Sequence, residues 1–444
     1  MDSVLFRDQF GTPEMREIFS DESVVQRWLD VEAALARVQG RLGVIPAWAA
    51  EEIESKARVE LIDLEELKRE MDRTAHPIVP LLRLMKRVCE KDAGEYIHWG
   101  ATTQDIVDTG TVLQVRDALD EIERSLRELH ARIKTLCVRY RDQVMVGRSH
   151  GQQALPITFG FKAAVWADEI RRHLGRLAQM RKRVLVGQFS GAVGSLAALG
   201  EQGLAVQRAL FAELGLETPE ISWHVSRDGI AELVCVLAIC AATAGKIAHE
   251  IYCLQKTEVA ELEEPFAMGK VGSSTMPHKR NPPACETIVA VARLVRHSVP
   301  AALEAVMAEH ERDKMVLQTE REFIPRVCAM THLVLRKLGA VLDGLSVRTG
   351  NMEKNLFLQN GLLMSEAVMM RLSDALGRQE AHEIVYRICM DVFERGGSLK
   401  QALMEDPVVA GRLDEDDIDA MLDPRVYTGL CGHFVDQVVA QPLP

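Results

Sequence analysis

The chain has 444 residues, of which 47% are hydrophobic and 27% are charged, and its formal net charge is −12. This length allows two or three domains with large apolar cores. The acidic balance argues against nucleic acid or an anionic membrane surface as a partner, because either would favour a basic patch.

Cysteine usage and the first residues bear on the compartment. The nine cysteines are scattered, and none falls into a Cys-x-x-Cys or mixed Cys/His spacing. We therefore expect free thiols in a reducing cytosol, with neither a metal nor another cofactor. Residues 1–11 contain no apolar run, so no signal peptide is expected.

Helical periodicity dominates the chain from residue 112 onward. Over 112–140, apolar residues recur every three or four positions with charges between them. This spacing predicts one heptad-patterned helix on the order of 45 Å long. Similar patterns predict four further long helices, over 159–185, 230–258, 286–310 and 325–345. Strand signals are nearly absent, so we expect an all-α fold.

Helices of this length need neighbours that cover their apolar faces. Residues 233–244 are the most apolar stretch; they are too short to span a bilayer and predict a buried helix. Small side chains across 237–245 permit close approach of another helix, at a bundle centre or a subunit interface. We favour a homo-oligomer, with burial inside one chain as the alternative.

Glycine and proline positions suggest three segments. We expect an N-terminal helical domain over 1–107, a central bundle of long helices over 108–350, and a C-terminal helical domain over 351–444.

One loop, 269–283, has features suited to chemistry. Two glycines make its backbone flexible, two serines follow, and three basic or ionisable side chains come next: His278, Lys279 and Arg280. Exposed backbone N–H groups in such a loop can hold an oxyanion, and a nearby lysine can neutralise a carboxylate. It is not a Walker A loop, because Gly-Lys-Ser/Thr is missing. From composition alone, the alternative is a solvated surface loop.

Residues 272–281 read Gly-Ser-Ser-Thr-Met-Pro-His-Lys-Arg-Asn. They match, at every fixed position, the fumarase/aspartase superfamily signature Gly-Ser-Ser-x-Met-Pro-x-Lys-x-Asn, and Glu286 matches the usual acidic position that follows. Residues 100–109 resemble the first of this family's three site regions. Residues 147–150, continuing through 156–160, resemble the second.

The chain is thus similar to fumarase/aspartase superfamily lyases over essentially its whole length, most visibly to the adenylosuccinate lyase and 3-carboxy-cis,cis-muconate cycloisomerase branches. The resemblance implies a three-domain fold around a central bundle. It also implies a homotetramer whose active sites form where three subunits meet.

The family reaction is an anti elimination across a succinyl unit, and the resemblance implies a role for each matching residue. Ser273 would be the general base and His150 the general acid. Lys279 and Asn281 would bind substrate carboxylates. Thr102 and Thr103 would hold a carboxylate from another part of the site, with Ser149 nearby. The alternative for the two threonines is a helix cap.

Four further residues are candidate contacts for a substrate. His76 and His224 fall where the family has active-site segments, although either could be structural. Arg312 and Arg321 could contact an anion, and the alternative for them is a solvated helix face.

The motifs disagree about the substrate, because His150 and Arg321 agree with adenylosuccinate lyases whereas the residues expected near a nucleotide phosphate do not. The Arg-Tyr pair that would hold a nucleotide phosphate near the N-terminus is replaced by Gln9-Phe10, and a Ser-Ser pair by Leu317-Gln318. Losing an arginine removes a charged contact worth about 1.5–3 kcal/mol. We therefore predict a small di- or tricarboxylate substrate and cleavage of a carbon–nitrogen bond in an N-substituted aspartate. A lactonising cycloisomerase is the runner-up, and adenylosuccinate cleavage is third.

A catalytically silent helical scaffold is the alternative from another class. The intact Ser273, Lys279, Asn281 and His150 speak against it.

Overall fold

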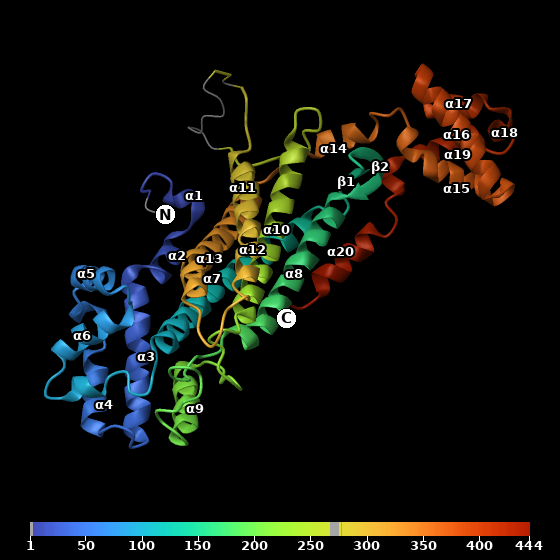
Figure 1. Ribbon diagram of the computed structural model, residues 1–444. Helices are drawn as coiled ribbons and strands as arrows, with labels where there is room; N and C mark the ends of the chain where they lie inside the picture. Colours follow the sequence, from blue (N-terminus) through green and yellow to red (C-terminus); the bar gives the residue numbers. More distant parts are fainter. Residues whose placement is uncertain (1–2, 267–274, 277) are drawn as a thin grey trace.

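The computed structural model describes residues 3–266, 275–276 and 278–444, and it is mostly helical (Figure 1). Five long helices form a central bundle: α7 (Thr103–Arg139), α8 (Phe159–Val184), α10 (Asp228–Gln255), α11 (Pro283–His297) and α13 (Lys314–Asp343). Their apolar faces share one core, so the expected long-helix bundle is confirmed.

Ion pairs show the relative directions of the bundle helices. Arg132, near the end of α7, binds Asp343 at the end of α13 (2.8 Å), so these two helices run parallel. Lys162, near the start of α8, binds Glu250 near the end of α10 (2.6 Å), so this pair runs antiparallel.

The N-terminal part packs short helices around a second apolar cluster. Its elements are α1 (Arg7–Phe10), α2 (Pro13–Ile18), α3 (Asp21–Arg41), α4 (Ala47–Lys56), η1 (Val59–Leu61), α5 (Leu64–Thr74), α6 (Ile78–Val88) and η2 (Ala93–Tyr96). The helix α9 (Gln202–Leu214) joins this cluster although it lies within the expected central segment.

The C-terminal part has its own small apolar core. Its elements are α14 (Thr349–Leu356), η3 (Leu362–Met364), α15 (Ser365–Leu376), α16 (Arg378–Arg395), α17 (Leu399–Glu405), α18 (Pro407–Ala410), α19 (Glu415–Leu422), η4 (Pro424–Val426) and α20 (Cys431–Ala440). The last helix returns to pack on α8. The three-domain boundaries stay a prediction.

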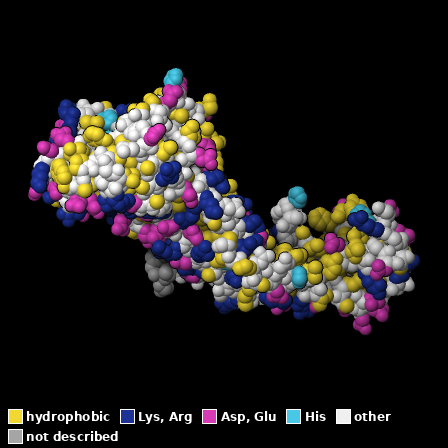
Figure 2. Space-filling view, turned by 90° about the horizontal axis from the view of Figure 1, so that it is seen from below, with side chains coloured by type: hydrophobic (Ala, Val, Ile, Leu, Met, Phe, Trp, Pro, Cys, Tyr) yellow, Lys and Arg dark blue, Asp and Glu magenta, His cyan; other side chains and the backbone are white. Residues whose placement is uncertain are grey.

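The molecule is long and bent. Figure 2 shows a broad hollow between the N-terminal mass and the smaller C-terminal part. By length and composition, α10 is the one described helix that could cross a membrane, yet 72% of its most apolar stretch is buried. This burial confirms the expected buried helix.

Four short strands accompany the helices in the described part of the chain, and two predicted helices have bounds other than those expected. A hairpin forms from β1 (Val144–Ser149) and β2 (Gln152–Thr158), and a short pair from β3 (Leu262–Glu263) and β4 (Ser346–Val347). The helix expected over 286–310 ends at His297, and α12 (Val299–Glu304) follows with a proline in its first turn.

The helix expected from residue 325 instead starts at Lys314 and contains Pro325. Proline has no N–H, so the carbonyl of Arg321, four residues earlier, receives no helical hydrogen bond from it.

A buried polar chain joins α8 and α10. Arg176 donates to Nδ1 of His173 (3.1 Å), so the opposite nitrogen carries the proton and donates to the Thr243 hydroxyl (2.8 Å). Burial, together with the charge of Arg176, lowers the pKa of His173 to about 4. This histidine is therefore neutral in the folded chain at neutral pH.

The variant His173→Gln should flatten the pH dependence of the free energy of unfolding. Between the ordinary histidine pKa of about 6.5 and the folded value, the unfolded chain binds a proton that the folded chain does not. Stability therefore falls as pH falls, by up to about 1.4 kcal/mol per pH unit from this group. Urea unfolding at fixed protein concentration tests this. Parallel pH curves for wild type and variant would contradict it.

Candidate active site

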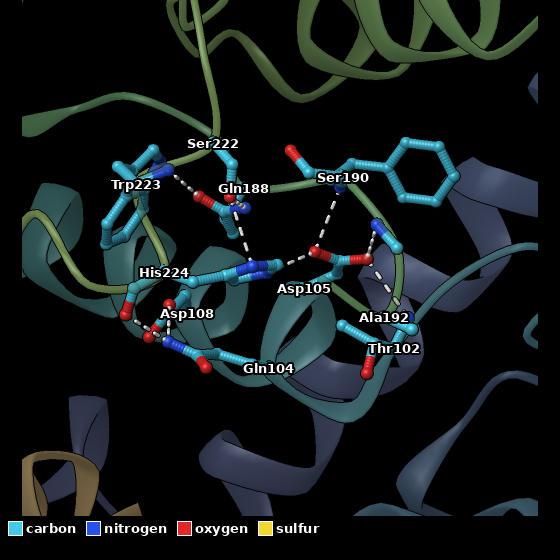
Figure 3. Close-up of polar contacts among 12 residues, drawn as sticks. Thr102, Gln104, Asp105, Asp108, Gln188, Ser190, Ala192, Ser222, Trp223 and His224 are labelled. Atoms are coloured by element: carbon cyan, nitrogen blue, oxygen red, sulfur yellow. Dashed lines mark hydrogen bonds and ion pairs between the residues drawn. The ribbon is translucent and has the colours of Figure 1, made fainter. Parts of the chain in front are cut away.

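The N-terminus of α7 forms a tightly held corner of the molecule. Thr102 occupies the helix N-cap position, and its backbone N–H donates to the Asp105 carboxylate (3.0 Å). The same buried carboxylate accepts from the backbone N–H groups of Ser190 (3.0 Å) and Gly191 (2.9 Å). One side chain thus joins the start of α7 to the segment that crosses above it (Figure 3).

His224 lies behind this corner. Its Nε2 donates to Asp105 (2.8 Å) and its Nδ1 faces the Ser222 hydroxyl at 3.1 Å (Figure 3). The side chain is only 1% exposed, so within one chain it supports Asp105. A contact between His224 and the substrate stays a prediction.

A buried ion cluster fixes the starts of three bundle helices to each other. Arg227, 2% exposed, donates to both oxygens of Asp108 on α7 (2.9 and 3.0 Å) and to both oxygens of Glu320 on α13. Because breaking a buried pair leaves an uncompensated charge, this cluster strongly constrains the spacing of α7 and α13.

A pocket of about 150 Å³ opens beside the corner. It brings together four of the predicted contact residues: His76, Thr103, Arg312 and Arg321. They come from the α5–α6 connection, the first turn of α7 and the region around the start of α13. The N-terminus of a long helix favours bound negative charge, so this position suits an anion.

His76 is arranged as a neutral donor in this pocket. The Val79 N–H donates to its Nδ1 (3.2 Å), so in the neutral ring Nε2 carries the proton and donates to the Thr103 hydroxyl (3.1 Å). Burial lowers the pKa of His76, and the neighbouring cations Lys314, Arg312 and Arg321 lower it further. The Thr103 O–H then remains available to donate to a ligand.

The pocket carries an excess of positive charge. Arg312 donates to the Ala192 carbonyl (2.5 Å), and Lys314 to the Ala75 carbonyl (2.9 Å). Within the described part of the chain, neither side chain has a carboxylate ion-pair partner and no acidic residue lines the pocket. Arg321 also lacks a carboxylate ion pair there, and Asp108, whose charge acts on it, is already bound by Arg227.

The predicted base, Ser273, lies outside the described residues. Lys279 and Asn281 are described and line a larger pocket, about 610 Å³, at the far end of α10. Lys279 is exposed and Asn281 half-buried.

Glutamates on the adjoining β3 segment hold the base of this loop. Glu263 pairs with Arg280 (2.9 Å) and with Arg348. Glu264 accepts from the backbone N–H groups of Ala284 (3.2 Å) and Cys285 (2.9 Å), at the start of α11. The segment that carries Lys279 and Asn281 is therefore fixed at its C-terminal side.

Ser149 and His150 lie at the exposed tip of the β1–β2 hairpin. His150 (φ 52°) and Gly151 (φ 77°) both have positive φ, as a two-residue hairpin turn of type I′ requires. Arg148 holds the hairpin to buried Glu261 through two hydrogen bonds (2.7 and 2.9 Å).

The candidate residues therefore form two groups at opposite ends of the bundle. The His76 pocket and Thr102 lie at the start of α7, whereas the hairpin follows its end. Thirty-seven residues of helix separate them by about 55 Å. Arg148 and Glu261 place the hairpin at the same end as Lys279. One chain does not bring all the predicted residues into a single site.

Sequence reasoning missed three residues. Lys314 lines the pocket, Asp105 organises the corner, and His98 donates its backbone N–H to Glu32 while its ring lies 2.6 Å from the same carboxylate. Burial alone would lower the pKa of His98, but Glu32 outweighs it and raises the pKa. Lys314 was detectable, because it lies two residues after Arg312 in a segment already marked as cationic.

No group of three or more His, Cys, Asp or Glu side chains among the described residues is arranged to hold a metal ion. The absence of a cofactor stays an expectation.

Comparison with known proteins gives matches over nearly the whole chain. Residues 7–296 match the family described as "Lyase", and residues 361–438 match "Adenylosuccinate lyase C-terminus". An N-acetyl-S-(2-succino)cysteine lyase of Dickeya dadantii is 44% identical, covering 99% of this chain and 96% of the relative.

Two solved structures are similar in sequence and in fold. The crystal structure of a fumarate lyase from Mesorhizobium sp. BNC1 matches with a TM-score of 0.92 and 41% identity, covering 98% of this chain and 99% of that one. A 3-carboxy-cis,cis-muconate lactonizing enzyme from Pseudomonas putida matches with a TM-score of 0.91 and 36% identity, covering 98% of each chain.

The variant Asp105→Asn should lower the free energy of unfolding by about 2–3 kcal/mol, because an amide NH2 would face backbone N–H donors that now have an acceptor. The matched control is Asp120→Asn on the same helix, whose side chain is 57% exposed and should matter by less than about 1 kcal/mol. Urea unfolding of both variants measures the difference. Equal losses would contradict the role given to Asp105.

Proposed function

The chain belongs to the fumarase/aspartase superfamily of lyases, and on that premise we propose that it removes a proton and a heteroatom leaving group from a succinyl compound to release fumarate. The observation that carries this proposal is the pocket where His76, Thr103, Arg312 and Arg321 meet without a carboxylate ion-pair partner among the described residues. A cationic pocket at a helix N-terminus suits a substrate carboxylate.

The chemistry requires stabilised negative charge. A base removes a proton from the carbon next to a carboxylate, and the resulting charge moves onto the carboxylate oxygens. Preorganised donors aimed at those oxygens lower the barrier. We assign Ser273 as the base, with Lys279 and Asn281 as donors at one carboxylate. Thr102 and Thr103 bind the other.

The leaving group departs from the opposite face in an anti elimination. We assign His150 to protonate it, with Ser149 beside it. The exposed hairpin tip leaves both side chains accessible to a substrate or to another subunit.

The relative from Dickeya dadantii, named for a succinylated thiol, favours sulfur as the leaving atom. The sequence analysis favoured nitrogen, and an N-substituted aspartate is the second candidate. Lactonisation of 3-carboxy-cis,cis-muconate is a weaker candidate, supported by the lactonizing enzyme of similar fold. Adenylosuccinate is disfavoured because Gln9 and Phe10 replace the expected phosphate contacts.

We further propose that the site is completed by other copies of the chain, as a homotetramer. The two groups of candidate residues are about 55 Å apart along α7, so one chain cannot close around one succinyl unit. Several apolar side chains on the bundle helices and on the neighbouring α12 are exposed in the single chain, and a neighbour would cover them. They are Val165, Ile239, Leu294 and Leu303.

Absorbance assays test the reaction on a panel of compounds. Fumarate formation is followed for a succinylated thiol and for N-substituted aspartates, and loss of substrate is followed for 3-carboxy-cis,cis-muconate, whose lactonisation releases no fumarate. Fumarate should form from the thioether, and Ser273→Ala should lower kcat by about 10²–10⁴-fold because the base is lost. The control Ser298→Ala removes an exposed hydroxyl at the other end of α11 and should leave kcat unchanged.

Two results would count against this proposal. Undiminished activity of Ser273→Ala would remove Ser273 from its role. Failure of every succinyl compound to release fumarate would end the proposed reaction.

Mixing two inactive variants tests the shared site. Arg321→Met removes a side chain from the pocket at the start of α7, and Ser273→Ala removes the proposed base from the loop. Each variant alone should therefore lose most activity. Co-expressed chains should regain a measurable fraction, because some sites in a mixed oligomer would receive both wild-type residues from different copies. A mixture no more active than its components would contradict a site built from several chains.

A further inference from the structure

The pocket beside the start of α7 holds more positive charge than a succinyl unit needs. That unit has two carboxylates, and the proposed function already assigns them to Thr102 and Thr103 and to Lys279 and Asn281. Arg312, Lys314 and Arg321 remain, and among the described residues no carboxylate forms an ion pair with any of them.

Uncompensated cations that converge on one pocket mark an anion site. Arg312 and Lys314 are held in place by backbone carbonyls at 2.5 and 2.9 Å, so their charge is positioned without being neutralised. His76 adds no charge to the pocket, because its ring is neutral. Its Nε2–H already donates to the Thr103 hydroxyl. Asp108, whose negative charge acts on Arg321, is already bound by Arg227.

We propose, on the basis of the proposed function, that this pocket binds a carboxylate carried by the leaving group, so that the substrate is a tricarboxylate. Lys314, Arg312 and Arg321 then select for a short amino-acid-like leaving group. Apolar walls from Val107 and Leu317 contact its carbon chain.

The part of the pocket that one chain forms is small. A volume of about 150 Å³ is below the several hundred Å³ typical of sites for drug-sized ligands. It accommodates a carboxylate on a few carbon atoms, whereas a nucleoside monophosphate is larger. A planar guanidinium pairs well with a carboxylate through two parallel hydrogen bonds.

Two thioethers test this inference with the full-length wild-type protein. N-acetyl-S-(2-succino)cysteine carries the third carboxylate, and N-acetyl-S-(2-succino)cysteamine is the same molecule without it. Fumarate release gives kcat/KM for each. If neither compound is turned over, calorimetric Kd values for the same pair give the same comparison, so the result does not depend on catalysis.

The cysteine compound should be favoured by about 10- to 100-fold, because one charge-assisted contact is lost with its carboxylate. Lys314→Met and Arg321→Met should each reduce this preference for the cysteine compound over the cysteamine compound. Arg336→Met, which removes an exposed arginine about four turns further along α13, should leave it unchanged.

The outcomes separate the two proposals. Equal kcat/KM or equal Kd for the two thioethers would overturn the third-carboxylate site, even if both compounds release fumarate. A ratio unchanged in Lys314→Met and Arg321→Met would also overturn it, as would tighter binding of adenylosuccinate than of the cysteine thioether. Absence of fumarate with a preserved difference in Kd would instead overturn the proposed reaction alone.

Discussion

The length of α7 is the constraint on which the rest of the structure depends. Its thirty-seven residues form a rod whose first turn carries Thr103 and whose end leads into the hairpin with His150. A helix does not shorten or fold back, so residues at its two ends cannot meet around one small substrate. This separation is the reason for proposing a site shared between copies of the chain, and the bend seen in Figure 2 would offer a surface for neighbours.

Two kinds of charged group lie at the start of α7, one buried and paired and the other exposed. Asp105 and the Arg227 cluster are fully paired, and they give the helix starts fixed positions. Arg312, Lys314 and Arg321 have no carboxylate ion pair in the described part of the chain, and backbone carbonyls hold the first two. In the proposed function, the paired groups provide a rigid frame in which the unpaired ones would hold an anion without rearrangement.

Much of the bundle could be predicted from the sequence, because heptad spacing reports directly which helix face is buried. The hairpin could not, since β1 and β2 are short and their turn is His150-Gly151 rather than a typical turn pair. The start of α13 was placed too late because Pro325 looks like a helix start, although the surrounding bundle tolerates it inside the helix.

The sequence suggested candidate residues for the site but not their arrangement, and their roles stay a prediction. Resemblance to the family suggested His76, Thr103, Arg312 and Arg321, and the fold brings these four into one pocket. Position along the sequence could not reveal that Lys279 and His150 lie at the other end of the bundle. Asp105 was missed because a buried carboxylate that binds backbone N–H groups leaves no periodic signal.

A crystal structure of the full-length protein with fumarate bound tests the central claim most directly. The account predicts one fumarate contacted by Thr103 of one chain, by Lys279 and Asn281 of a second, and by the hairpin tip of a third. A fumarate enclosed by residues of a single chain, with neighbouring copies absent from its contacts, would contradict it.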